Sequence, residues 1–335
     1  MIKIGLIGIG RLGAQYLERI LESDYFTFIG CYDTDPNQLK RIEEDFSITC
    51  FNDVDELIRQ CDAVCIVTSI ESHFYYAEKA IKYSKHVFVE KPICNNLEEA
   101  RKLVALVEEA GIKFQVGHIE RFNPAFLASQ DEVIDPKFIE AHRLSHFDVK
   151  CKDTSVVLDL MIQDIDIILH LVKGNIKSIS ASGVAVVSDE IDIANARIEF
   201  DNGSVASLTA SRISNHKMRK MLFFQKDNQI TIDFLQRETE LLKVSERQKG
   251  HSIPIRFNEQ TRYLNSETIA LEEYDALKEE LNSFAECMIF NTEPKVTALD
   301  GFRSLEVACE ILQKIQKLNG TSLVESEHTD EPVNY

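Results

Sequence analysis

The chain has 335 residues, of which 44% are apolar, and this composition suits about two globular domains with substantial cores. Its 37 basic and 55 acidic side chains give a net charge of −18, which excludes nucleic acid as a favoured partner. No run of about 18 apolar residues is present, so we expect no membrane-spanning helix and no membrane partner. The N-terminus has the pattern of a strand and not of a signal peptide, and the eight cysteines are scattered without a C-x-x-C pair. These features predict a cytoplasmic protein with reduced thiols.

The first 120 residues alternate between short apolar runs typical of strands and amphipathic stretches typical of helices. Strands are expected at Ile2–Ile7, Phe26–Tyr32, Ala63–Val67, His86–Val89 and Lys113–Val116. Helices are expected at Leu12–Leu21, Pro36–Asp45, Val54–Gln60, His73–Lys82 and Leu97–Ala110. This alternation predicts an α/β domain whose parallel sheet is covered on both faces.

The pattern changes after Arg121, where strands follow one another. Strands are expected at Lys137–Phe147, Ile176–Val187, Ile191–Phe200, Val205–Ile213, Met218–Phe224 and Gln229–Phe234, and helices at Val156–Val172, Leu271–Ile289 and Ala298–Lys317. Apolar and polar side chains alternate over 194–200, which is the period of a sheet with one covered face. Asn202-Gly203 predicts a hairpin turn. We expect domains at 1–121 and 122–322 and a flexible acidic tail at 323–335.

Gly8-Ile9-Gly10-Arg11-Leu12-Gly13 lies between the first expected strand and the first expected helix and has the spacing of a dinucleotide-binding loop. The first glycine allows a tight turn, the second lets the backbone approach a pyrophosphate, and the third lets helix and strand pack closely. The helix N-terminus adds free N–H groups and a positive dipole end. We therefore assign cofactor contacts to Gly8, Gly10, Arg11, Leu12 and Gly13. For Arg11, a solvated side chain on the first helical turn is an equal alternative.

Asp33 ends the second expected strand, 20 residues after Gly13. A carboxylate at this place binds the ribose hydroxyls and repels a 2′-phosphate. Thr34 and Asp35 follow it, so no neighbouring arginine is available for such a phosphate. The expected cofactor is NAD, with NADP as the less favoured alternative.

Two further signatures are K-H-V-F-V-E-K-P at 85–92 and G-H-I-E-R-F-N-P at 117–124. With the glycine loop they make the chain resemble the Gfo/Idh/MocA oxidoreductases from Met1 to about Leu318. The resemblance implies an N-terminal Rossmann domain and a C-terminal α+β domain with a large open, mostly antiparallel sheet. It also implies a small-molecule sugar or sugar-nucleotide substrate and a homodimer or homotetramer formed through the C-terminal sheet.

Lys91 lies at the carboxyl end of a parallel strand, where open α/β sheets bind their ligands. The resemblance implies that Lys91 is catalytic and contacts the cofactor, and that it precedes a cis bond to Pro92. It implies that Glu90 contacts the cofactor or orients Lys91. A further cofactor contact is expected at Thr68, after the third strand. His73, farther along, is expected to cap or pack.

The family also carries an aspartate and a histidine four residues apart on a helix of the second domain. Asp159 matches the aspartate, but Gln163 stands where the histidine is expected. Glutamine hydrogen-bonds a hydroxyl but cannot exchange a proton near neutral pH. Asp159, Gln163 and Asp166 share one face of an α-helix, so we assign the first two to catalysis and Asp166 to substrate binding. His170 on that face, or Lys91 alone, are the alternatives for the proton.

Arg121 and Asn123 are assigned to substrate binding by the same resemblance, and for Arg121 an interdomain salt bridge is an equal alternative. No set of His, Cys, Asp and Glu residues has the spacing of metal ligands, so no metal is expected.

The sequence therefore predicts an NAD-dependent oxidoreductase that removes a hydride from a secondary hydroxyl of a sugar or sugar nucleotide. The run at 117–124 and V-L-D-L-M-I-x-D-I-D at 157–166 are similar to those of UDP-N-acetylglucosamine 3-dehydrogenases, which favours carbon 3 of that substrate. Two alternatives remain open. One is an oxidoreductase that acts on an inositol, a free sugar or another cyclic substrate, and the other is a non-catalytic NAD-binding regulatory protein.

Overall fold

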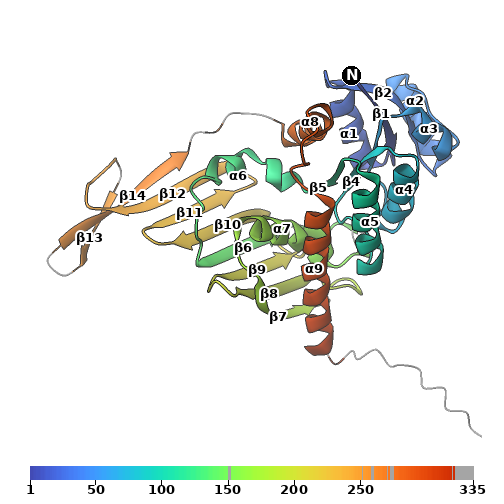
Figure 1. Cartoon of the computed structure of the whole chain (residues 1–335). Helices are drawn as coiled ribbons and strands as arrows, with labels where there is room; N and C mark the ends of the chain where they lie inside the picture. Colours follow the sequence, from blue (N-terminus) through green and yellow to red (C-terminus); the bar gives the residue numbers. More distant parts are fainter. Residues whose placement is uncertain are drawn as a thin grey trace, which may run out of the picture.

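The computed structural model describes residues 1–149, 152–250, 252–257, 260–269, 271, 275–318 and 320, and these residues form two β-sheets with helices packed on them (Figure 1). Sheet A has five parallel strands in the order β2-β1-β3-β4-β5. Its strands are β1 (Ile2–Ile7), β2 (Phe26–Tyr32), β3 (Ala63–Ile66), β4 (His86–Glu90) and β5 (Phe114–Gly117). The helices between them are α1 (Arg11–Leu21), α2 (Pro36–Phe46), α3 (Val54–Gln60), α4 (Ile70–Lys82) and α5 (Leu97–Ala110). The expected parallel α/β domain is confirmed.

The strand order of sheet A changes direction between β1 and β3. From β1 the chain moves outward to β2 on one side. It then returns to β3, next to β1, and continues to β4 and β5 on the other side. The loops that follow β1 and β3 therefore run in opposite directions at the carboxyl ends of the strands. Such a switch point opens the crevice in which doubly wound folds bind ligands. Helices cover both faces, and every residue of β3 is accordingly buried.

Two C-terminal helices return to sheet A from the end of the chain. Helix α8 (Ala276–Ile289) packs Leu281 and Phe284 into the core that α1 forms with the sheet. Helix α9 (Ala298–Leu318) buries Leu305 in the other core of sheet A and Ile311 in the core of the second sheet. Both helices lie within the expected second domain, so its boundaries remain a prediction. The expected tail at 323–335 lies outside the described residues.

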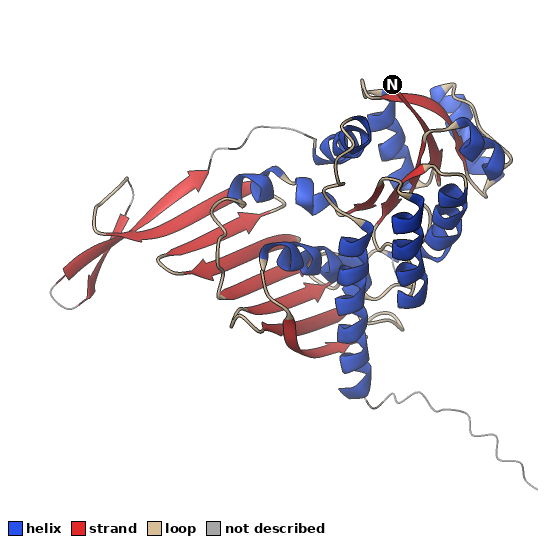
Figure 2. Ribbon diagram, in the orientation of Figure 1, coloured by secondary structure: helices blue, strands red, loops and turns tan. Residues whose placement is uncertain are grey.

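Sheet B has nine strands in the order β13-β14-β12-β11-β10-β6-β9-β8-β7. They are β6 (Phe138–Leu144), β7 (Ile176–Val184), β8 (Ile193–Phe200), β9 (Val205–Ser211), β10 (Met218–Gln225), β11 (Asn228–Asp233), β12 (Glu238–Ser245), β13 (Ser252–Phe257) and β14 (Gln260–Ile269). Strands β6 and β9 are parallel neighbours, and the other neighbouring pairs are antiparallel. Helices α6 (Pro124–Ser129), α7 (Ile162–Leu171) and α9 cover one face, and the described helices leave the other face open (Figure 2). The expected open, mostly antiparallel sheet is confirmed.

The expected hairpin between β8 and β9 is present. Gly203 has φ of +83°, in the left-handed region that favours glycine, and it donates its N–H to the Phe200 backbone oxygen. Strands β12 to β14, by contrast, were not expected from the sequence. Side chains of β13 and β14 are mostly exposed and the strands lack the apolar alternation of a half-buried sheet, which is the signal that reveals a strand. Pro254 fits β13 because that strand lies at the edge of sheet B.

The expected single α-helix at 156–172 is wrong in its first turn. Residues Val157–Met161 form a π-helical turn, η3, and the α-helix α7 begins at Ile162. A π-turn winds more residues into each turn than an α-helix does, so the α-helical face that relates Asp159 to Gln163 does not apply across it. Turns of this kind are frequent at functional sites.

A buried network of charges joins the two sheets through Arg143 of β6, which is 2% exposed. Its guanidinium donates to Asp164 Oδ1 of α7 at 2.7 Å and to Glu120 Oε1 at 2.8 Å. Glu120 lies in the 3-10 helix η1 (Ile119–Phe122) that leads from β5 toward sheet B. Each buried charge has a partner, which offsets the cost of removing it from water.

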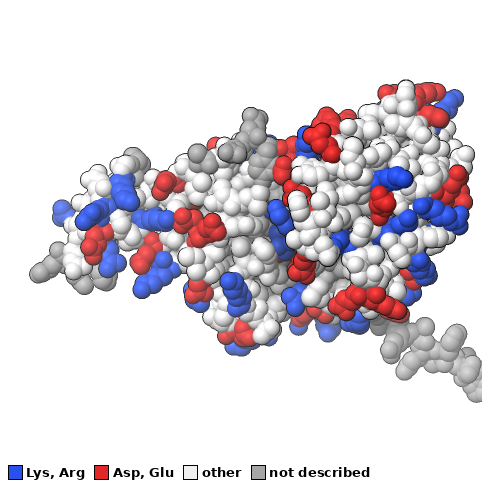
Figure 3. Space-filling view, turned by 45° about the horizontal axis from the view of Figure 1, so that its top comes forward, with Lys and Arg blue, Asp and Glu red and all other residues white. Residues whose placement is uncertain are grey.

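No helix among the described residues is long and apolar enough to cross a membrane. Charges of both signs mix over most of the surface in Figure 3, but basic side chains gather at the projecting end of sheet B. Exposed residues there include Arg247, Lys249, Arg256 and Arg262. The net negative charge is thus unevenly spread.

Arg143→Met tests the charge network between the sheets. It leaves Glu120 and Asp164 buried without a cationic partner, so the free energy of unfolding should fall by ~3–5 kcal/mol in urea titration. Arg197→Met is the matched control, because Arg197 pairs with Glu199 on the exposed face of sheet B and should cost less than ~1 kcal/mol. Equal losses in the two variants would contradict this account.

Candidate active site

The loop between β1 and α1 is tightly packed at two of its three glycines and open at the other. Gly8 has φ of +90°, and a Cβ there would lie 2.6 Å from the Val67 backbone oxygen. A Cβ on Gly13 would overlap the backbone oxygen of Gly8. Gly10, at the N-terminus of α1, has nothing within 4 Å of where its Cβ would stand. The loop therefore leaves space in front of the free N–H groups of α1.

A cavity of about 390 Å³ lies beside this loop. The residues that line it come from the ends of β1, β2 and β3 and from α4: Ile7, Gly8, Gly10, Tyr32, Asp33, Thr34, Val67, Thr68, Ser69, Ser72 and Tyr76. Asp33 Oδ2 accepts a hydrogen bond from the Ile9 N–H at 2.8 Å, so the backbone of the glycine loop orients this carboxylate. Arg11 and Leu12 are exposed on the first turn of α1, and Arg11 lies 3.9 Å from Asp148 Oδ2.

Lys91 follows β4 and reaches η3 in the second part of the chain. Its Nζ donates to the backbone oxygen of Asp159 at 2.6 Å and lies 3.3 Å from Asp159 Oδ1. The side chains are 17% and 26% exposed, so the pair is shielded but accessible. The Lys91–Pro92 peptide bond is cis, as the family resemblance implies.

Gln163 lies in the first turn of α7, which follows η3 directly. Its Oε1 accepts a hydrogen bond of 3.4 Å from Arg143, which also holds the neighbouring Asp164. Because arginine has only donors, the oxygen of the Gln163 amide faces it and the amide nitrogen faces elsewhere. Gln163 is thus oriented as a donor by a buried cation.

The structure places the three expected substrate-binding residues in buried contacts. Arg121 Nε donates to Asp166 Oδ2 at 2.5 Å and its second nitrogen to Oδ1 at 3.0 Å, and the two side chains are 5% and 1% exposed. The pair of Arg121 and Asp166 is a salt bridge between η1 and α7. A salt bridge of this kind was the alternative to substrate binding for Arg121. Asn123 caps α6 through the Ala125 N–H and donates to Glu120 and to the Phe234 backbone.

His73 is buried in α4 and joins the loops that follow β3 and β4. Its ring nitrogens lie 2.9 Å from the Pro92 backbone oxygen and 3.1 Å from that of Thr68. The histidine packs, as expected, and ties the Lys91 loop to the wall of the cavity. His170, the alternative base, is partly exposed at the other end of α7, with its ring 6.2 Å from that of Phe126.

Glu90 belongs to a buried cluster that sequence reasoning missed. The Tyr16 hydroxyl of α1 donates to Glu90 Oε1 at 2.5 Å and lies 3.3 Å from Glu280 Oε2 of α8. The Lys91 backbone N–H donates to Glu90 Oε2 at 2.9 Å. Burial raises the pKa of Glu90 above its usual value, and the Tyr16 hydrogen bond, the Lys91 charge and the Lys91 N–H limit this rise. Burial and the neighbouring Glu90 raise the pKa of Glu280 well above its usual range.

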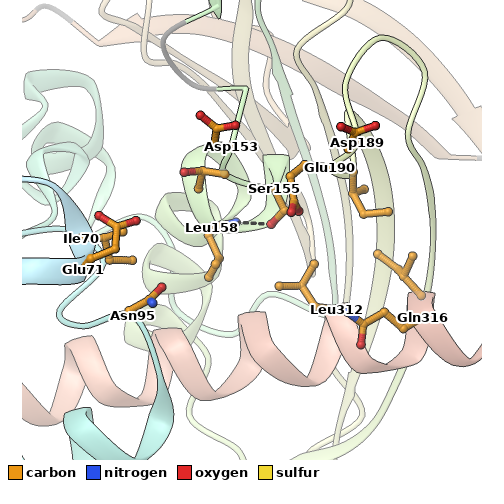
Figure 4. A pocket seen from close by; sticks show the side chains of 13 residues that line it. Ile70, Glu71, Asn95, Asp153, Ser155, Leu158, Asp189, Glu190, Leu312 and Gln316 are labelled. Atoms are coloured by element: carbon orange, nitrogen blue, oxygen red, sulfur yellow. Dashed lines mark hydrogen bonds between the residues drawn. The ribbon is translucent and has the colours of Figure 1, made fainter. Parts of the chain in front are cut away.

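A second cavity, of about 470 Å³, lies where the loops after β3 and β4 meet the second part of the chain (Figure 4). Glu71, Asp153, Asp189 and Glu190 line it, with an apolar floor that includes Leu158 and Leu312. Leu158 directly precedes Asp159 in η3, but neither Lys91 nor Asp159 lines this cavity. Its described lining has four carboxylates and no lysine or arginine, so a ligand that carries phosphates would place them outside this cavity.

Residues 2–118 match the model of the oxidoreductase family with an NAD-binding Rossmann fold, and residues 132–233 match the model of the GFO/IDH/MocA C-terminal domain. The chain belongs to the Gfo/Idh/MocA oxidoreductase family. The resemblance inferred from the sequence motifs is therefore confirmed, and the protein is an oxidoreductase.

The relatives of this oxidoreductase include enzymes named for sugar-nucleotide and inositol substrates. It is 30% identical to the UDP-N-acetylglucosamine 3-dehydrogenase of Acidithiobacillus ferrooxidans over 92% of this chain and 96% of the relative. A solved structure of that enzyme superposes with a TM-score of 0.85 at 29% identity, covering 94% of this chain and 98% of the other. The scyllo-inositol 2-dehydrogenase (NAD(+)) of Bacillus subtilis is 27% identical over 91% of this chain and 92% of the relative.

The residues of this family member fit a nicotinamide dinucleotide. The open space at Gly10, the free N–H groups of α1 and the adjoining cavity provide room and donors for a pyrophosphate. Asp33 stands at the wall of the same cavity, and Thr68 and Lys91 follow β3 and β4 at the same edge of sheet A.

Gly10→Ala and Gly13→Ala separate cofactor binding from packing, and each is the control for the other. Gly10→Ala should leave the stability of the free protein unchanged and weaken NADH binding about tenfold, because its methyl group enters the open space. Gly13→Ala should destabilise the free protein by ~1–3 kcal/mol, because its methyl group meets backbone. Urea unfolding and NADH fluorescence measure the two effects, and intact NADH affinity in Gly10→Ala would refute the assignment.

Proposed function

We propose that this oxidoreductase uses NAD to oxidise a secondary hydroxyl of a sugar nucleotide, and that its substrate is UDP-N-acetylglucosamine, oxidised at carbon 3. The observation that carries the proposal is the contact of Lys91 with Asp159, because it joins the carboxyl edge of sheet A to the helical segment over sheet B. The choice of substrate is supported by the named relative that aligns with almost the whole chain.

In this proposal the residues around Lys91 bind the substrate hydroxyl and accept its proton. Asp159 holds the Lys91 Nζ in place. The Lys91 ammonium would be repelled by the positively charged ring of a bound oxidised nicotinamide, so that Lys91 would release its proton and then take the proton of the hydroxyl. The Gln163 amide nitrogen donates a hydrogen bond to the same oxygen, as its contact with Arg143 allows. The bound nicotinamide supplies the hydride acceptor. Arg121 and Asp166 act by fixing α7 against η1, and Asn123 by fixing α6.

We also propose NAD as the preferred cofactor over NADP, since Asp33 is held in the cavity wall and carries a negative charge. The open face of sheet B is the proposed surface of a homodimer or homotetramer. A cytoplasmic location is supported by the seven described cysteines, all of which are free thiols.

The proposed reaction is tested by NADH formation with UDP-N-acetylglucosamine, other UDP-sugars, free sugars and inositols. Lys91→Ala should lower kcat by about 100-fold or more, because it removes the group that takes the proton. Lys85→Ala, at the opposite end of β4, is the matched control and should keep full activity. The product should be a 3-keto sugar nucleotide, lighter than the substrate by two hydrogen atoms.

Each other outcome of this assay points to a different function. Faster turnover of an inositol or free sugar would replace the sugar-nucleotide proposal with that substrate. NADH binding without turnover of any compound would favour the alternative of a non-catalytic, NAD-binding regulatory protein. That alternative is open because Gln163 stands where the family has a histidine.

The cofactor proposal is tested at Asp33. Asp33→Ala should shift the ratio of the NADPH and NADH dissociation constants about tenfold toward NADPH, because it removes the charge that repels a 2′-phosphate. Asp24→Ala, which removes an equal charge from an exposed position, should leave the ratio unchanged. A ratio insensitive to Asp33 would contradict the assignment.

A further inference from the structure

The buried cluster of Tyr16, Glu90 and Glu280 brings two carboxyl groups to one tyrosine hydroxyl. The three side chains come from α1, β4 and α8, which are far apart in the sequence. Glu90 is the last residue of β4 and precedes Lys91, so the cluster lies directly behind the candidate active site. The reaction proposed above uses neither Tyr16 nor Glu280.

A count of donors shows which of the two carboxyl groups carries the charge. Glu90 receives two hydrogen bonds, from the Tyr16 hydroxyl at 2.5 Å and from the Lys91 N–H at 2.9 Å. A hydroxyl donates only once, so Tyr16 has no proton left for Glu280. Glu280 Oε1 is buried with no hydrogen-bond partner among the described residues. The Gln115 amide donates to the backbone oxygen of Glu280 and not to its carboxyl group.

A neutral Glu280 satisfies this geometry, whereas an ionised one does not. Its carboxyl O–H, 3.3 Å from the Tyr16 oxygen, donates to that oxygen, and the tyrosine donates in turn to Glu90. A carboxylate at 280 would face the charges of Glu90, Asp166 and Glu120 without a donor of its own. Lys91 is the cation near Glu90, and Cys65 is the remaining titratable group beside Tyr16. When two buried carboxyls share a site, one ionises and the other keeps its proton.

We propose that Glu280 and Tyr16 are positioning residues whose hydrogen bonds run in one direction, from Glu280 to Tyr16 to Glu90. These hydrogen bonds keep Glu90 ionised, and the charge of Glu90 makes the site bind oxidised nicotinamide in preference to reduced nicotinamide. The oxidised ring carries a positive charge and the reduced ring does not. A fixed negative charge at the ligand-binding edge of sheet A therefore favours the oxidised form. This inference rests on the nicotinamide cofactor of the proposed function and not on its substrate.

The test compares dissociation constants of NAD⁺ and NADH in the absence of any substrate, by NADH fluorescence and its displacement. Tyr16→Phe removes a donor from Glu90 and should reduce the relative affinity for NAD⁺ about fivefold or more. Glu90→Gln removes the charge itself and should act in the same direction. Glu280→Gln imitates the neutral acid and should leave the ratio within about twofold of wild type. Tyr25→Phe is the matched control, because Tyr25 also donates to a glutamate of α8, Glu286, outside the cluster.

The free protein offers a second measurement. A carboxyl whose folded pKa is raised binds its proton more tightly when folded, so stability is lost as pH rises from the unfolded value of about 4.3 toward the folded one. Glu280→Gln lacks this loss, and its free energy of unfolding relative to wild type should increase from about pH 5 to about pH 8. A relative stability that stays constant over this range would show that Glu280 is already ionised in the folded protein and would overturn the proposal.

The binding data decide the rest. An unchanged ratio in Tyr16→Phe that still binds NADH would overturn the role of Tyr16. Equal effects of Glu90→Gln and Glu280→Gln would overturn the direction of the hydrogen bonds, and this comparison holds even if Tyr16→Phe does not fold. Because no sugar is present, failure of the sugar-nucleotide proposal leaves these outcomes unaffected.

Discussion

The pairing of Arg143 with two buried carboxylates fixes the active-site segments relative to each other. The arginine comes from sheet B, Glu120 from the 3-10 helix that leaves sheet A, and Asp164 from the helix that carries Gln163. A charge buried in this way is stable only with all its partners in place, so the cost of breaking the network resists sliding of one sheet on the other. The contact between Lys91 and Asp159 spans the same junction and depends on that alignment.

Local sequence predicted most of sheet A and the cofactor loop because both depend on short-range features. Apolar runs mark β1 to β5, and the glycine spacing marks a turn whose geometry only glycine permits at Gly8. The contacts around Glu90 escaped prediction because Tyr16 and Glu280 are separated by most of the chain. Arg143 did leave a signal, since it shares the inward face of β6 with Ile139 and Ala141, where a charge requires buried partners.

The π-turn shows where periodicity misleads. The α-helical spacing between Asp159 and Gln163 suggested one shared face, yet a different contact orients each residue in the structure. Lys91 donates a hydrogen bond to Asp159, and Arg143 donates one to Gln163. A glutamine at this position therefore keeps a defined orientation without a histidine's proton chemistry. In the reaction that we propose, the proton would then pass to Lys91 across the junction.

Helix α9 belongs to the cores of both sheets, with Leu305 in one and Ile311 in the other. Each core includes side chains of this helix, so we expect the folding of the two halves of the chain to be coupled. Loss of either half exposes apolar surface of the other, and the two halves should melt in one cooperative transition. A dinucleotide that binds beside β1 would consequently protect the backbone amides of sheet B from hydrogen exchange, although it touches none of them.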